Sequence, residues 1–257
     1  NASGNAVYLS GKQALQYQVS TGGAVAINGV IRNLYGSATC SATLRSLITE
    51  PREHWMEQAL NRVTSRSIEA QTTINGALES APGNFSIPFD TQSSLASQLL
   101  VVARLIAGRS SLGASRQVFF VSTGGFDTHG DLNANHPGLL QNVGNAMATF
   151  DAAMLELGVA DQVTAFTASD FGRTLSSNGD GSDHGWGAYH FIQGGAVRGG
   201  RYWGQLPEVS VNGANDVGQG RLLPTTSVDQ LAATLARWMG LTESEIESVV
   251  PAIGNFT

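Results

Sequence analysis

The chain has 257 residues and a formal net charge of −6, and only 13% of its residues are charged. This length is sufficient for a substantial core, and so little charge argues against a coiled coil or a long solvated helix. An acidic balance without basic runs argues against a nucleic-acid partner. No apolar stretch approaches the roughly 18 residues of a membrane-spanning helix.

The first half of the chain predicts mainly helices. Two short strands are expected at 7–9 and 24–27, between turn residues. Apolar residues then recur at helical spacing over 52–80 and again over 93–108, which predicts two amphipathic helices.

A different pattern begins at residue 117. The apolar runs 117–122 and 162–168 each predict a buried strand, and the segment 137–157 between them has helical spacing and a helix stop at Gly158. Strand, helix and strand form a βαβ unit, so we expect one α/β domain over 1–257 with a mostly parallel sheet. A third strand (189–193) and two C-terminal helices (227–239 and 243–250) complete the prediction.

Acidic residues and histidines gather where these two strands end. Seven of the ten aspartates lie between Asp127 and Asp183, and four of the five histidines lie between His129 and His190. Ligands bind beyond the carboxyl ends of strands in open α/β sheets, so we expect one site there. The candidate residues are Asp127, His129, Asp170, Arg173, Asp183 and His184.

Neighbouring carboxylates repel one another unless protons, cations or a metal ion neutralise them. Mixed aspartate and histidine ligands suit zinc, manganese or iron better than calcium, which takes only oxygen. An imidazole that binds a metal needs a partner for its second nitrogen. Asp183 or Asp131 is an alternative candidate for that partner.

Each candidate also has an ordinary structural interpretation. Asp127 suits a turn, and Asp170 suits a helix N-cap. Arg173 suits an anionic substrate and equally an ion pair with Asp170. His190 lies inside the third expected strand, where it either packs or functions. His136 precedes Pro137 and is expected at a helix entry.

Other catalytic motifs are missing. The sequence has no Gly-x-Ser-x-Gly element and no P-loop, and its lone Cys40 excludes an internal disulfide. Four aromatic residues lie in or close after the loop expected at 178–187, which is rich in glycine and aspartate. They suit either ordinary packing or a stacking wall for a sugar, and they are Trp186, Tyr189, Tyr202 and Trp203.

Several spaced motifs together resemble the family called domain of unknown function 1501. The motifs are Gly124–His129, Ser169–Thr174, Asn178–Gly185, Gly194–Gly200 and Thr226–Trp238. The resemblance implies the fold of the alkaline phosphatase and sulfatase superfamily, with a mostly parallel central sheet flanked by helices. It also implies an exported bacterial protein, periplasmic or extracellular, often with a twin-arginine signal.

That superfamily binds one or two divalent metal ions through aspartate and histidine. The residues that match are Asp127, His129, Asp170, Asp183 and His184, although Asp127-Thr128-His129 is shorter than the superfamily's Asp-x-x-x-His. Such families begin with an apolar strand ending in Gly-Gly-Asn-Asp-Gly, which is missing here. We therefore expect a C-terminal portion of a longer protein, or a partner chain that completes the sheet, or a half-lost metal site.

The resulting hypothesis is an exported metal-dependent hydrolase acting on phosphate or sulfate esters. The five matching residues would hold zinc or manganese, while Arg173 and His190 would bind a small anionic ester or carbohydrate substrate. Thr128, Ser169 and Ser182 are candidate nucleophiles by position only. The alternative is a non-catalytic exported protein that keeps the fold for binding or surface assembly.

Overall fold

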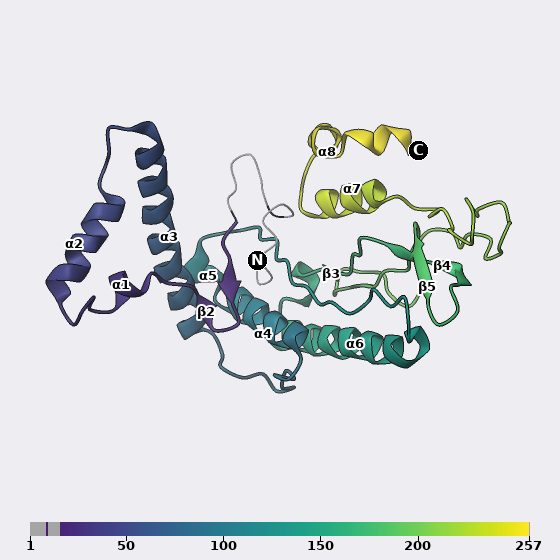
Figure 1. Ribbon diagram of the computed structural model, residues 1–257, viewed down its shortest axis with the longest axis horizontal. Helices are drawn as coiled ribbons and strands as arrows, with labels where there is room; N and C mark the ends of the chain where they lie inside the picture. Colours follow the sequence, from purple (N-terminus) through teal and green to yellow (C-terminus); the bar gives the residue numbers. More distant parts are fainter. Residues whose placement is uncertain (1–8, 10–15, 257) are drawn as a thin grey trace. The chain divides into compact units, whose positions relative to one another are not determined.

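The computed structural model describes Leu9 and residues 16–256, in which eight α-helices accompany three small sheets (Figure 1). The chain divides into two compact units. Unit 1 contains residues 1–123 and 142–158, and unit 2 contains residues 124–141 and 159–257. The prediction of a single domain over 1–257 stays a prediction.

Unit 1 is mainly helical. Its sheet pairs β1 (Val19–Ser20) with β2 (Gly23–Ala24) in antiparallel register. Its helices are α1 (Asn28–Ile31), α2 (Ala38–Thr49), α3 (Trp55–Ser80), α4 (Ser94–Ala107) and α5 (Arg109–Leu112). The long helix α6 (Leu132–Glu156) begins in unit 2 and continues into unit 1.

Helix α4 forms the centre of unit 1. The hydroxyl of Ser93 accepts the N–H of Ala96 and so caps the start of the helix. Gly108 ends it, and a Cβ at Gly108 would lie 2.5 Å from the carbonyl oxygen of Ala77, so only glycine allows this approach to α3. Nine α4 residues are buried, and Val101 and Leu105 pack with Val19 and Leu78.

The strand predicted over 117–122 is wrong. These residues form no strand and belong to none of the sheets in the described part of the chain. A side chain supplies bonds that a neighbouring strand would otherwise provide: the N–H of Ser122 donates to Oε1 of Gln98 (3.0 Å), and Nε2 of Gln98 donates to the carbonyl of Ser122 (2.9 Å). Phe119 packs against the cluster of Val19, Leu78, Val101 and Leu105, whereas Val118 is 58% exposed, so the segment is only partly buried.

Unit 2 contains short strands, and none of those described is parallel. Strand β3 (Ala165–Phe166) pairs antiparallel with β6 (Ile192–Gln193), and β4 (Gly172–Ser177) pairs antiparallel with β5 (Ser182–Gly185). The expected fold, a mostly parallel central sheet of the alkaline phosphatase type, is therefore wrong. The run 162–168 forms only a two-residue strand, because its partner is the returning segment 192–193 rather than 117–122.

Strands β4 and β5 form a hairpin that the sequence analysis did not predict. Its turn is closed by Asn178, whose N–H donates to the carbonyl of Gly181 and whose Oδ1 accepts the N–H of Gly181. Gly179 takes a φ of +121° inside this turn, a conformation that glycine adopts without strain. The Asn178-Gly179 pair is the usual signal of a tight hairpin, and it could have predicted this one.

Most predicted helices are confirmed. Helix α3 fits the prediction for 52–80 and α4 fits 93–108. The C-terminal pair also appears as expected, as α7 (Val228–Trp238) and α8 (Glu243–Val249), followed by a 3-10 turn (Pro251–Asn255). A second 3-10 turn (Ala160–Gln162) precedes β3.

Other boundaries differ from the predictions. Helix α6 starts at Leu132, five residues before the expected start, so His136 and Pro137 lie inside it rather than at its entry. Helix α2 was not predicted. The strand expected at 24–27 is reduced to Ala24 at the end of β2, and residues 7 and 8 of the other N-terminal strand lie outside the described residues.

None of the helices in the described ranges has both the length and the apolar character that crossing a membrane requires.

Candidate metal site

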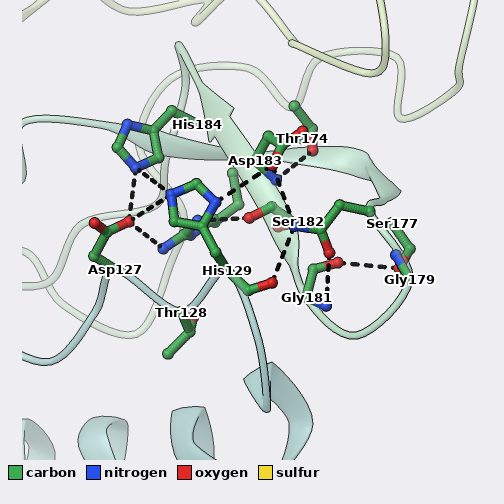
Figure 2. Close-up of polar contacts among 12 residues, drawn as sticks. Asp127, Thr128, His129, Thr174, Ser177, Gly179, Gly181, Ser182, Asp183 and His184 are labelled. Atoms are coloured by element: carbon green, nitrogen blue, oxygen red, sulfur yellow. Dashed lines mark hydrogen bonds and ion pairs between the residues drawn. The ribbon is translucent and has the colours of Figure 1, made fainter.

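Three side chains of unit 2 meet at one point. Asp127 and His129 lie in the loop before α6, and His184 lies on β5 (Figure 2). We call Asp127, His129 and His184 the Asp–His–His trio. Within the described part of the chain, it is the only group of three or more histidine, cysteine, aspartate or glutamate side chains whose ligand atoms all lie within 4.8 Å of one another.

The trio is held tightly although all three residues are exposed. Oδ1 of Asp127 lies 2.7 Å from Nε2 of His184 and 3.0 Å from Nε2 of His129. The two Nε2 atoms are 3.2 Å apart. One carboxylate oxygen and two imidazole nitrogens thus form a nearly equilateral triangle.

These contacts change the acidity of the carboxylate. The hydrogen bond from His184 is the largest cause that holds the pKa of Asp127 below its ordinary value, and the charges of the two imidazoles add to it. Asp127 is therefore an anion at neutral pH. Once its proton is displaced, each imidazole can join the carboxylate as a ligand that zinc, iron and manganese accept.

The second ring nitrogen of His129 faces another carboxylate. Nδ1 of His129 lies 3.3 Å from Oδ1 of Asp183. Nδ2 of Asn178 donates to the same Oδ1 (3.2 Å) and to the carbonyl of His129 (3.0 Å). These hydrogen bonds, first from Asn178 and then from His129, hold the pKa of Asp183 below its ordinary value.

Arg173 fixes the position of Asp127. It stands on β4 opposite His184 and is mostly buried, with one fifth of its side chain exposed. Its guanidinium donates to the carbonyls of Ser182 and Phe126 (both 2.6 Å) and to Oδ1 of Asp127 (3.2 Å). The structure thus pairs Arg173 with Asp127 rather than with Asp170, and most of its donors are already used within the chain.

Phe171 supports the trio and was not identified from the sequence. Its ring stacks on that of His184 with centroids 3.8 Å apart and planes only 3° from parallel. The guanidinium of Arg173 also lies over the Phe171 ring, 5.0 Å from its centroid. The sequence could not predict this role, because a phenylalanine carries no ligand atom and its stacking on His184 depends on how the chain folds.

Two predicted site residues lie elsewhere. Asp170 is an exposed residue at the bend before β4 and does not belong to the trio. His190 contacts Thr167, whose Oγ1 lies 3.2 Å from its Nδ1, and local desolvation lowers the pKa of His190. Their predicted roles, a metal ligand and a substrate contact, stay predictions.

The candidate nucleophiles differ in their access to solvent. Thr128 and Ser182 are buried, at 6% and 5% exposure, although both neighbour trio residues in sequence. Ser169 is exposed and donates its hydroxyl to the carbonyl of Phe171. Only Ser169 of these three hydroxyls is accessible.

The sequence matches one known family. Residues 36–252 match the family described as "Protein of unknown function (DUF1501)", so the chain belongs to that family. No curated protein and no solved structure matches the chain.

Proposed function

We propose that this chain is a metal-dependent hydrolase that acts on phosphate or sulfate esters. The observation that carries the proposal is the convergence of three ligand atoms from Asp127, His129 and His184 on one point. Exported location, in the periplasm or outside the cell, belongs to the same proposal and rests only on the resemblance to the domain of unknown function 1501 family.

The trio fits a divalent metal ion in size and chemistry. Ligands about 2.0–2.1 Å from a metal lie about 2.9 Å apart at right angles and about 3.4 Å apart at a tetrahedral angle. The triangle has sides of 2.7, 3.0 and 3.2 Å, close to this range. Two histidines and one carboxylate form one face of a coordination sphere and leave other positions open, as catalytic metal sites do.

The chain's own residues would prepare this site. When bound, a divalent ion supplies charge that polarises the oxygen of an ester. Arg173 orients Asp127, and the exposed trio leaves the substrate an open approach. Thr128 and Ser182 are buried, and the hydroxyl of Ser169 is engaged in a hydrogen bond to the carbonyl of Phe171. We therefore propose water as the attacking group, which converts the ester and one water into an alcohol and an inorganic anion.

The test combines metal analysis with hydrolysis. We expect the purified chain to bind one equivalent of Zn²⁺ or Mn²⁺ by calorimetry and to hydrolyse p-nitrophenyl phosphate or sulfate. His129→Ala should abolish both properties. His54→Ala is the matched control, because His54 caps the N-terminus of α3 in unit 1 and is not part of the trio. Absence of binding in the natural chain, or unchanged binding in His129→Ala, would contradict the proposal.

A second candidate function is carbohydrate binding without catalysis. It is favoured by the exposure of Trp186 and Trp203, at 69% and 58%, because stacking on a sugar requires accessible rings. Titration with neutral and sulfated oligosaccharides should quench tryptophan fluorescence in the natural chain and less so in Trp186→Ala. An unchanged fluorescence signal would remove this candidate.

A further inference from the structure

The first half of unit 1 contains a pair of helices that is largely uncovered. Helix α2 and residues 55–66 of α3 lie side by side and are joined by the short connection 50–54 (Figure 1). We call this pair the α2–α3 hairpin. No residue of α1 or α2, which are both described in full, is buried, and Asn61 is the only buried residue of 55–66. Because helices are stabilised mainly by burying an apolar face against another layer, this pair is expected to have a partner.

A groove with a largely aliphatic lining runs between the two helices of the hairpin. The lining includes Leu44 and Ile48 of α2 and Leu60 of α3, and Leu60 is 65% exposed although it faces the groove. Met56 and Val63 lie within one turn of Leu60 and extend this exposed apolar surface along α3. A contiguous exposed apolar surface of this kind marks an interaction site.

Polar contacts fix the shape of the hairpin. Nδ2 of Asn61 donates to the carbonyl of Glu50 (2.6 Å), and the backbone N–H of Arg52 donates to Oε1 of Gln58 (2.6 Å). Both contacts tie the connection 50–54 to α3. A partner that binds here therefore meets a preformed surface, and the loss of conformational entropy on binding is small.

The two charged residues of the groove suit a twofold-symmetric partner. Arg52 follows α2 and Glu57 lies in the first turn of α3, so both stand at the same end of the groove, and both are exposed. When a second copy faces this one with the twofold axis along the helices, each α2 lies against the partner's α3. Arg52 then meets Glu57 of the partner subunit, and the same contact forms twice. The opposite orientation would place these charges against the apolar end of the groove near Leu44.

A second copy also matches the hairpin in length and direction. Helix α2 has 12 residues, and 55–66 has the same number, which corresponds to about 18 Å for each helix. Two hairpins in the orientation above therefore cover one another from end to end. Every neighbouring pair of helices is then antiparallel, as in up-down-up-down four-helix bundles, which bury the inner face of each helix.

We propose that two copies of this chain associate through the α2–α3 hairpin, which forms a four-helix bundle with two reciprocal ion pairs, each between Arg52 and Glu57 of the partner subunit. The inference concerns unit 1 alone and does not depend on the proposed hydrolysis.

The first experiment measures the association of the full chain by sedimentation equilibrium. We expect a dimer at micromolar concentration, and Leu60→Asp should raise its Kd by roughly 100-fold, because it places a charge at the centre of the apolar contact. Leu155→Asp is the matched control, because Leu155 is 63% exposed on α6 and lies outside the hairpin, so its Kd should equal that of the natural chain. Both side chains are mostly exposed, so both variants should keep the far-ultraviolet circular dichroism of the natural chain.

The second experiment tests the orientation of the two copies by reversing charges. Arg52→Glu or Glu57→Arg alone brings like charges together across the interface and should raise the Kd about tenfold at low salt. The double variant with Arg52→Glu and Glu57→Arg restores opposite charges and should return the Kd to that of the natural chain.

The outcomes decide between a second copy and any other occupant of the groove. A chain that stays monomeric at millimolar concentration would overturn the proposal, and so would a dimer whose Kd is the same in Leu60→Asp. A double charge variant that associates no better than the single variants would overturn the pairing of Arg52 with Glu57 of the partner subunit. If the chain binds no metal, the proposed function fails, and the association measurement still decides the role of the hairpin.

Discussion

Helix α4 and the β4–β5 hairpin illustrate two different ways of holding a structure together. Among the described residues, nineteen buried apolar side chains belong to unit 1 and only four belong to unit 2. The hairpin instead depends on hydrogen bonds, glycines and one stacked ring around Arg173 and His184. Apolar burial supplies most of the favourable free energy of folding, whereas hydrogen bonds have preferred angles and so fix the orientation of individual side chains. Stability and site geometry should therefore respond to different substitutions.

The largest effect on stability is expected in unit 1. Leu105→Ala removes a buried side chain that packs with Val101 and Leu78, which should lower the free energy of unfolding by about 2–5 kcal/mol in urea titrations. Zinc affinity should not change. Leu47→Ala in α2 is the control, because Leu47 is 55% exposed and its loss should cost little. Equal costs for the two variants would show that α4 is not the packed centre.

The largest effect on the site is expected at a glycine of the hairpin. A Cβ at Gly181 would lie 2.5 Å from the carbonyl oxygen of His129, so Gly181→Ala must displace the loop that carries this ligand. Zinc affinity measured by calorimetry should fall by roughly 100-fold, the upper end of the range seen when groups that support metal ligands are changed.

Gly138→Ala serves as the control for this glycine. Gly138 lies inside α6, and a Cβ added there would meet no atom within 4 Å outside the helix's own backbone and its chain neighbours, so alanine should stabilise the helix by up to about 1 kcal/mol. Unaltered zinc binding in Gly181→Ala would mean that the ligand loop tolerates movement.

A smaller effect is expected when the guanidinium of Arg173 is replaced. Lysine keeps the charge but lacks the planar fork that reaches two carbonyls and Asp127 together, so Arg173→Lys should weaken zinc binding by about tenfold. Arg201→Lys provides the comparison, because Arg201 contacts the ring of Trp203. If both variants bind zinc equally well, Asp127 does not need its guanidinium partner.

The smallest effect concerns pH. Desolvation lowers the pKa of His190 in the folded chain, so the unfolded chain binds its proton more readily. The contribution of this group is therefore complete above the ordinary pKa of about 6.5 and declines as pH falls toward the folded value. Urea titrations from pH 8 to 5 should show a shallower loss of stability in His190→Gln, and identical slopes would contradict the burial argument.

The helices could be predicted because their signals are local. Ser93 and Gly108 mark the ends of α4, and Ser227 forms a capping box with Gln230 at the start of α7. The start of α6 could not be read in this way. It depends on Asp131, which takes a φ of +52° and donates its N–H to Asp180, a residue 49 positions away.

The sheets were harder to predict from the sequence than the helices, and the site was predicted only in part. An apolar run such as 117–122 indicates burial but not its partner, and here the partner is a side chain. The structure brings Asp127, His129 and His184 together, and the sequence grouped them because scarce chemical groups are concentrated in one region. Asp170 and Asp183 lie outside this group, and their roles as metal ligands stay predictions, because spacing along the chain does not place a side chain to within a few ångströms.

The pairing of Gln98 with Ser122 has a consequence for how the protein behaves in concentrated solution. Extended apolar segments with open backbone groups recruit strands from other molecules and so promote aggregation. At Ser122, one amide side chain already occupies both the backbone donor and the backbone acceptor. An incoming strand would therefore find the backbone N–H of Ser122 already engaged by Gln98.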